Sequence, residues 1–252
     1  MSDHDPAGSR PWPRPSRPWV MAQAWHDLLF AHWPIAPETL RGKLPRTLEL
    51  DTFHGTAWLG VVPFRMSGVR LRGTAPLPWL SAFPELNVRM YVRYGERTGV
   101  WFLSLDAARW LAVAIARAWF RLPYFRAQMS CTRDGEDVVY ASVRTHAGAP
   151  RAELAVRYGP RGDVFLPRPG TLEHWLTERY GLYALSRRGE ALFAEIDHPP
   201  WPLQPAAAIF EKNTMAGAHG IELPASAPFL HFVRRQDVVV WGPQRATSPQ
   251  AT

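Results

Sequence analysis

Four polar side chains of different chemistry alternate with apolar residues in the segment 83–92. Glu85, Asn87, Arg89 and Tyr91 fall on one face of a predicted strand, and the residues between them are leucine, valine and methionine. A carboxyl, an amide, a guanidinium and a phenol in one row can bind an anion and move a proton. The row therefore predicts either a polar pocket, in which Arg89 binds a substrate anion and Glu85 takes or orients a proton, or a solvent-exposed face with a structural ion pair.

A second polar row follows in the predicted strand 124–133, where Tyr124, Arg126 and Gln128 alternate with apolar residues. If both rows face one cavity, its two arginines, its carboxylate and its phenols suit a small carboxylate or enolate ligand. The predicted site then comprises Glu85 as the catalytic acid or base, with Asn87, Arg89, Tyr124 and Arg126 as ligand-binding residues.

Other titratable groups have more ordinary interpretations. Arg179 follows a predicted helix, where it forms either a salt-bridged helix end or part of the pocket rim. His174 and Glu178 have the i, i+4 spacing of a helical metal pair, but no third ligand accompanies them, so no metal site is predicted. Asp51 and His54 precede Gly55, and turns that end in glycine use aspartate routinely.

The sequence lacks the motifs of several large enzyme classes. It contains no G-x-S-x-G, no Walker loop and no G-x-G-x-x-G, so hydrolase, nucleotide and dinucleotide functions have no support. Cys131 is the only cysteine, which excludes an intramolecular disulfide. We interpret it as a small buried apolar residue, and no cofactor is predicted.

Alternating and β-branched segments predict a strand-rich chain. About ten strands are expected, together with two main helices at 107–120 and 170–179 and a short helix at 37–45 that begins with Pro37. Asp106 and Thr171 are the expected N-caps of the two main helices. The strands are expected at 56–66, 85–94, 99–105, 124–133, 137–145, 152–158, 180–186, 191–196, 230–233 and 238–241.

We expect a single β-barrel domain at residues 19–243, with helices packed on a closed or half-closed barrel. The apolar face opposite the polar row at 83–92 should be covered by those helices. Residues 1–18 are rich in proline and arginine and predict a disordered or extended lead-in, and residues 244–252 predict a flexible tail.

Charge and hydropathy narrow the possible partners. The net charge is +7, from 29 basic and 22 acidic residues, but the arginines are scattered, which argues against nucleic-acid binding. Three charged residues interrupt the most apolar stretch, 100–120, so no membrane span is expected. We expect a cytoplasmic protein, and the sequence predicts no oligomeric state.

Several segments, in order along the chain, resemble a bacterial family of unknown function called DUF2071, or YqjF-like. The resemblance covers residues 19–243 and rests on seven segments: His32–Pro34, Leu50–Trp58, Phe83–Val92, Ser104–Ala107, Leu122–Met129, Leu176–Tyr183 and His198–Gln204.

More remotely, this family is similar to the acetoacetate decarboxylase-like superfamily. That resemblance implies a cone-shaped, mostly antiparallel β-barrel with flanking helices and an interior pocket. In those decarboxylases a strand glutamate lies near a lysine that forms a Schiff base with the ketoacid. Glu85 resembles that glutamate, whereas Tyr124 and Phe125 stand where the family has paired lysines. Lys43 and Lys212 lie far from this motif, so we expect no Schiff-base chemistry.

Three functions remain open from the sequence. The first is a small-molecule-binding barrel that acts on a small organic acid or ketone by acid–base chemistry. The second is a non-catalytic binding module or sensor with the same pocket. The third is a binder of nucleic acid or anionic surfaces, which requires the arginines to gather on one external face.

Overall fold

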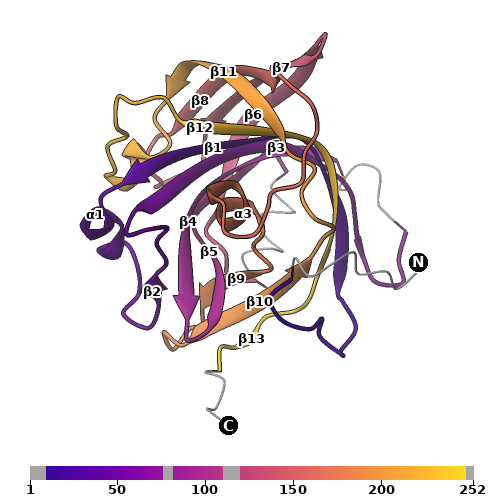
Figure 1. The fold of residues 1–252 in the computed structure, drawn as a ribbon, viewed down its shortest axis with the longest axis vertical. Coiled ribbons are helices and arrows are strands. Elements are labelled where there is room, and N and C mark those ends of the chain that lie inside the picture. Colours follow the sequence, from indigo (N-terminus) through magenta and orange to yellow (C-terminus); the bar gives the residue numbers. More distant parts are fainter. Residues whose placement is uncertain (1–9, 76–81, 110–119, 248–252) are drawn as a thin grey trace.

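The computed structural model describes residues 10–75, 82–109 and 120–247, and most of them lie in one large β-sheet (Figure 1). The strands are β1 (Met21–Ile35), β2 (Glu49–Leu50), β3 (Ala57–Leu71), β4 (Phe83–Tyr94), β5 (Arg97–Ala107), β6 (Tyr124–Asp134), β7 (Asp137–Arg144), β8 (Glu153–Pro160), β9 (Gly181–Leu185), β10 (Ala191–Asp197), β11 (Gln204–Asn213), β12 (Phe229–Val240) and β13 (Gln244–Arg245). Two short α-helices, α1 (Pro37–Arg41) and α3 (Leu172–Thr177), and a 3-10 turn at Gly217–His219 complete the described elements.

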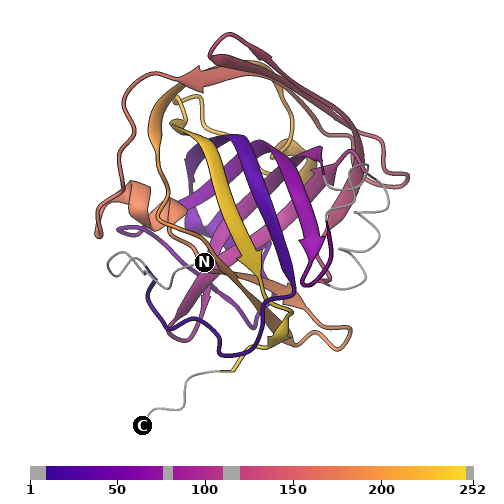
Figure 2. The ribbon, with the colours of Figure 1, turned by 90° about the vertical axis from the view of Figure 1, so that its right-hand side faces the viewer.

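The sheet closes on itself because β4 pairs with β5. The sequence of neighbours β5-β6-β7-β8-β11-β12-β1-β3-β4 forms a closed barrel of nine strands. Figure 2 shows the long strands β12, β1 and β3 side by side across its middle. Most pairings are antiparallel, and the exceptions are β5 with β6 and β5 with β9. The expected mostly antiparallel barrel of the acetoacetate decarboxylase-like type is thus confirmed.

Strands β5 and β12 change neighbours along their length, and this creates a second closed ring. Val100 of β5 pairs with Leu182 of β9, whereas Leu105 pairs with Tyr124 of β6. Likewise, β12 pairs with β11 near Phe232 and with β10 near Val240. We call the second ring, formed by β1, β3, β4, β5, β9, β10 and β12, the cavity ring. Helix α3 lies across one open end of it (Figures 1 and 2).

The central strands β1, β3 and β4 are buried on both faces. On one face, Leu86, Val88 and Met90 join a core completed by β7 and β8. The other face turns toward the inside of the cavity ring and belongs to a separate core. The apolar face of β4 was expected to be covered by helices; among the described residues its cover comes mainly from strands β7 and β8, with Leu40 of α1. Strands provide it because β6 leaves β5 and carries the sheet around the back of the barrel.

Two glycines allow β9 to approach β5. A Cβ atom on Gly99 would lie 2.8 Å from the carbonyl oxygen of Gly181. A Cβ on Gly181 would lie 2.1 Å from the ring of Phe193 on β10. Only a residue without a side chain fits at either position, so the close approach of these strands depends on glycine.

The short helices form where the sequence predicts them. Pro37 stands in the first turn of α1, and the Thr171 side chain accepts a hydrogen bond from the backbone N–H of His174 at the start of α3. Residues 110–119 of the predicted helix 107–120 lie outside the described residues. Its expected N-cap, Asp106, is in fact a residue of β5, because its carboxylate pairs with Arg144 inside the barrel.

Both ends of the described chain contact the barrel. Arg10, in the predicted lead-in, donates hydrogen bonds to the Ile196 carbonyl (2.8 Å) and to the Asp197 carboxylate (3.1 Å). Gln244 and Arg245, in the predicted flexible tail, pair with β10 as β13. Residues 10–18 and 244–247 thus contact the barrel through ion pairs, hydrogen bonds and backbone pairing.

Strand prediction from the sequence was incomplete in three places. No strand was predicted before residue 56, but Met21–Ile35 forms the long strand β1. No strand was predicted at 204–213 either, and Gln204–Asn213 forms β11. The two strands expected at 230–233 and 238–241 are one continuous strand, β12. None of the helices in the described parts of the chain is long and apolar enough to cross a membrane.

Candidate functional site

A cavity of about 540 Å³ occupies the inside of the cavity ring. Its walls are mainly apolar and aromatic, with contributions from Trp25, Phe64, Met66, Phe102 and Trp201. A few polar side chains interrupt these walls: Gln23, Arg70, Thr74, Glu85, Asn87, Arg89, Tyr124, Thr177 and Arg179. An apolar enclosure with a small number of polar groups is the usual form of a small-molecule site.

The polar row of β4 faces this cavity. Glu85, Asn87 and Arg89 all line it, and each side chain is buried. Tyr124, from β6, lines the same cavity. The structure thus brings four of the five predicted site residues to one cavity, and the two strands meet there at Glu85 and Tyr124.

Glu85 and Tyr124 form a buried hydrogen-bonded pair. The Tyr124 hydroxyl donates to Oε2 of Glu85 over 3.0 Å. Burial raises the pKa of Glu85 to about 8, an effect that the Tyr124 hydrogen bond opposes and the nearby Asp106 carboxylate reinforces. Burial and the Glu85 carboxylate also raise the pKa of Tyr124 well above its ordinary value. A carboxyl group with a pKa near neutrality can both donate and accept a proton at physiological pH.

Arg89 has no counter-ion among the described residues. Its Nη2 donates to the Tyr91 hydroxyl and to the Leu176 carbonyl, both at 3.3 Å. Its guanidinium carbon lies 5.1 Å from the ring centroid of Phe30, so one face packs against an aromatic ring. Its Nε atom is buried and has no hydrogen-bond partner among the residues that the structure describes.

Arg179 packs against the same aromatic ring as Arg89. Its guanidinium carbon is 4.9 Å from the Tyr91 ring centroid, and the carbon of Arg89 is 5.7 Å from the same centroid. Burial lowers the pKa of Arg179, the adjacent Asp51 carboxylate raises it, and the charge of Arg89 lowers it further. Arg179 pairs with Asp51 over 2.6 Å, yet its Nη2 has no hydrogen-bond partner in the described ranges. The sequence left a helix-end salt bridge and a pocket rim as alternatives, and Arg179 combines an ion pair with a place in the cavity wall.

The predicted role of Arg126 as an anion clamp does not fit the structure. Arg126 and Gln128 are exposed and are not among the cavity-lining residues, whereas Ala127 is buried. The simple alternation fails because β6 changes partner at this point. It runs beside Leu105–Ala107 of β5 up to Arg126 and then pairs with β7 from Ala127 onward. Strand spacing alone does not reveal such a change.

Tyr91, the last residue of the polar row on β4, links Arg89 to His32 through its hydroxyl group. Its hydroxyl is 2.6 Å from Nε2 of His32 and accepts the hydrogen bond from Arg89. Burial lowers the pKa of His32 well below its ordinary value, and the charge of Arg89 lowers it further. His32 is consequently neutral and adds no charge beside Arg89.

The remaining candidates have structural roles. Glu178 accepts hydrogen bonds from the Tyr180 hydroxyl (2.5 Å) and the Trp201 backbone N–H (2.9 Å). Within the described ranges, no group of three histidine, cysteine, aspartate or glutamate residues could hold a metal ion. Burial raises the pKa of Cys131 to about 11, so its thiol stays protonated. Neither Lys43 nor Lys212 lines the cavity, and Lys212 pairs with Glu153 on the surface.

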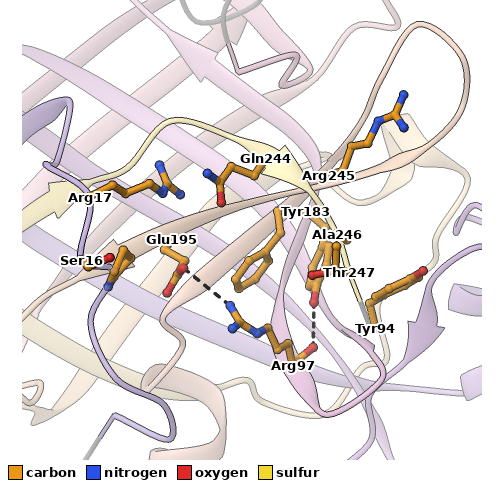
Figure 3. Close-up of a pocket in the computed structure, with 12 residues that line it drawn as sticks. Ser16, Arg17, Tyr94, Arg97, Tyr183, Glu195, Gln244, Arg245, Ala246 and Thr247 are labelled. Atoms are coloured by element: carbon orange, nitrogen blue, oxygen red, sulfur yellow. Dashed lines mark hydrogen bonds and ion pairs between the residues drawn. The ribbon is translucent and has the colours of Figure 1, made fainter. Parts of the chain in front are cut away.

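A second, smaller hollow of about 360 Å³ lies where the two ends of the described chain meet the barrel. Figure 3 shows Arg97 between Glu195 and the residues that follow β13. Arg97 approaches the Glu195 carboxylate at 3.6 Å, and its backbone carbonyl accepts a hydrogen bond from Tyr183 at 2.8 Å. Because Arg10 also pairs with Glu195, this hollow is the joint between the terminal segments and β10.

Comparison with known proteins identifies the family. The DUF2071 model, described as an uncharacterized conserved protein, matches residues 22–237. The chain belongs to the DUF2071 family. It is 44% identical over 223 residues to the uncharacterized protein YqjF of Bacillus subtilis, covering 88% of this chain and 91% of that protein.

Solved structures share the fold at low sequence identity. The enduracididine biosynthesis enzyme MppR, in complex with pyruvate, has a TM-score of 0.61 at 12% identity and covers 92% of each chain. The acetoacetate decarboxylase of Legionella pneumophila has a TM-score of 0.59 at 15% identity and covers 100% of each chain. At this identity the likeness establishes the acetoacetate decarboxylase-like fold of the DUF2071 chain.

Proposed function

We propose that the interior cavity binds a small organic acid or ketone and that Glu85 acts there as a general acid–base. The observation that carries the proposal is the Glu85–Tyr124 pair, a buried carboxyl with a pKa of about 8 in the wall of an apolar cavity. Perturbed carboxyl groups of this kind gather at catalytic sites because proton transfer needs a pKa near the working pH. The proposed place of action is the cytoplasm.

The proposed chemistry is proton transfer next to a carbonyl group. The ionised Glu85 carboxylate takes a proton from the carbon beside the carbonyl, and the electron pair of the C–H bond passes to the carbonyl oxygen as an enolate. Return of a proton from Glu85 to that carbon restores the ketone. Tyr124 stabilises the carboxylate by hydrogen bonding, and Asn87 and Arg89 orient the ligand. The scheme uses no Schiff base, since none of the described cavity-lining residues is a lysine.

Exchange of ketone protons for deuterium tests this function. With 2-octanone and 7-oxooctanoate in D₂O, proton NMR should show loss of the signals next to the carbonyl. The enzyme-dependent rate should rise as the pH passes through about 8, where Glu85 ionises. Glu85→Gln should remove this component, and only the hydroxide-catalysed background should remain. Exchange by Glu85→Gln at the wild-type rate would exclude Glu85 as the base.

A non-catalytic binding module is the second candidate. It is favoured by Tyr124 and Phe125, which stand where the decarboxylases that the sequence resembles have lysines. In that case the ketones bind, the Trp25 and Trp201 fluorescence changes, and no exchange above background follows.

Small-molecule binding is preferred over nucleic-acid binding because many exposed arginines are already paired. Carboxylates lie within ion-pair distance of exposed arginines on several different strands: Arg93 with Glu49, Arg157 with Asp134, Arg235 with Asp237 and Arg245 with Glu190. A phosphate backbone would have to displace these partners.

A further inference from the structure

The cavity has two chemically different ends. Glu85 lies opposite Ala107 of β5, whereas Arg89 lies opposite Phe102. Four residues of strand separate the Cα atoms of Glu85 and Arg89 by roughly 13 Å. Their side chains engage different partners, because Glu85 bonds to Tyr124 while Arg89 contacts Tyr91 and Leu176. The proton-transfer group is therefore at one end, and the two buried arginines are at the other.

The positive end holds more charge than its partners neutralise. Arg89 and Arg179 are 8% and 5% exposed, and both pack against Tyr91. Among the described residues, Asp51 is the only carboxylate within ion-pair distance of either guanidinium. A buried charge without a partner is costly, and the charge of Arg89 also disfavours the charged form of Arg179. One negative charge placed between Arg89 and Arg179 would balance this end.

Unsatisfied polar atoms mark the same residues. Within the part of the chain that the structure describes, Nε of Arg89 and Nη2 of Arg179 are buried donors without partners, and Oδ1 of Asn87 is a buried acceptor without one. A carboxylate supplies two acceptor oxygens to neighbouring guanidiniums, with geometry that guanidinium donors match well. Asn87 lies between Arg89 and Glu85 on β4, so a hydrogen-bond donor further along the ligand could reach it.

The space between the two ends is apolar. Leu105, Phe102, Val62 and Phe64 line it, together with Trp25 and Trp201. A volume of about 540 Å³ falls within the range of pockets that enclose ligands much larger than pyruvate. A two-carbon or three-carbon acid bound at the arginines would leave most of this apolar wall without contact.

We propose that the natural ligand is an elongated monocarboxylic acid with an apolar body, whose carboxylate binds between Arg89 and Arg179 and whose far end reaches Glu85 and Tyr124. This inference deepens the proposed function and rests on it for the identity of the site. It assigns Arg179, together with Arg89, as the anion-binding pair in place of Arg126.

Calorimetric titration with straight-chain acids tests the proposal directly. The probes are acetate, butanoate, hexanoate and octanoate, each paired with the primary alcohol of the same length. Each added methylene should tighten acid binding about threefold to fourfold, as expected for burial of a CH₂ group. Octanoate should bind at least tenfold more tightly than octanol. Acetate binding as tightly as octanoate, or octanol matching octanoate, would overturn the proposal.

Variants of the arginines test whether the positive end of the cavity binds the carboxylate. Arg89→Met should abolish the preference for acid over alcohol, and the exposed Arg126→Met, which keeps the cavity charges, should retain it. Because Arg179→Met would leave Asp51 unpaired, the double variant Asp51→Asn/Arg179→Met is the suitable second test. An unchanged acid preference in Arg89→Met and in the double variant would refute the assignment.

Glu85→Gln distinguishes this proposal from the proposed function. Its preference for octanoate over octanol should persist, because Arg89 and Arg179 at the other end of the cavity determine that preference. Octanoate binding without ketone exchange in the wild type would support the ligand class and reject catalysis. Ketone exchange without any preference for acids would support catalysis and reject the ligand class.

Discussion

The Tyr140 hydroxyl donates a 2.8 Å hydrogen bond to the backbone carbonyl of Glu85 from the opposite face of the sheet. Tyr140 belongs to the core between β4 and β7, whereas the Glu85 side chain faces the cavity. The core between β4 and β7 thus holds the backbone of Glu85 in place, and Glu85 is the residue proposed to transfer protons.

Stability should fall with rising pH through the titration of Glu85. Burial raises the pKa of Glu85 from 4.5 to about 8 in the folded protein, so unfolding releases a proton between these values. The contribution of Glu85 to the free energy of unfolding is therefore complete below about pH 4.5, and it is lost as the pH rises to about 8. The loss should amount to a few kcal/mol, on the order of 1.4 kcal/mol per pH unit where only one state is ionised.

Urea denaturation at pH 5, 6, 7 and 8 checks this prediction against Glu85→Gln. Glutamine resembles the protonated carboxyl and does not ionise, so the variant should lack this component of the pH dependence. Identical slopes of unfolding free energy against pH in the two proteins would show that Glu85 is not the titrating group.

Arg89→Met should change the melting temperature by only a few degrees, because Arg89 has no ion-pair partner among the described residues and its removal relieves repulsion with Arg179. Arg144→Met provides the contrast. Arg144 holds the buried Asp106 carboxylate through two hydrogen bonds of 2.7 and 2.8 Å. Its loss should cost about 3–5 kcal/mol. Thermal and urea denaturation measure the stability of both variants. If Arg89→Met fails to fold, Arg89 has a structural role and the prediction is wrong.

Gly181→Ala should destabilise the protein by about 1–3 kcal/mol through overpacking. The new methyl group would lie 2.1 Å from the Phe193 ring, where β9 meets β10. Phe193→Leu in the same chain should recover part of the loss, because leucine is smaller. Gly189→Ala is a useful comparison, since nothing lies within 4 Å of its Cβ position and only its positive φ of 78° opposes the change. Equal stability of Gly181→Ala and the wild type, measured by urea unfolding, would contradict the close approach.

Borohydride should fail to trap a ketoacid on this chain. Schiff-base formation needs an amine, and the described cavity wall contains no lysine. Intact-mass spectrometry after treatment with 7-oxooctanoate and sodium borohydride should show the unmodified mass. An adduct on Lys43 or Lys212 would overturn the prediction.

Local patterns predicted the part of the site that depends on one strand. The alternation of β4 placed Glu85, Asn87 and Arg89 together because a regular strand has a period of two. The same rule failed at Arg126, where β6 exchanges one partner strand for another. Arg179 carried no periodic signal, since it lies between α3 and β9 and reaches Asp51 from far along the chain. Strand β11 was missed because its alternation consists largely of proline, alanine and exposed residues.

The limits of sequence similarity do not coincide with the limits of the folded unit. The family match ends at residue 237, but Val239 and Val240 form the pairing of β12 with β10. It begins at residue 22, beyond Arg10, which binds the carbonyl and carboxylate groups of β10. A chain shortened to 22–237 would also lose β13, so only β9 would still pair with β10. Such a chain should keep the nine-strand barrel but lose the pairing that closes the cavity ring, so water would enter the cavity. The two ends of the chain therefore help to enclose the ligand site.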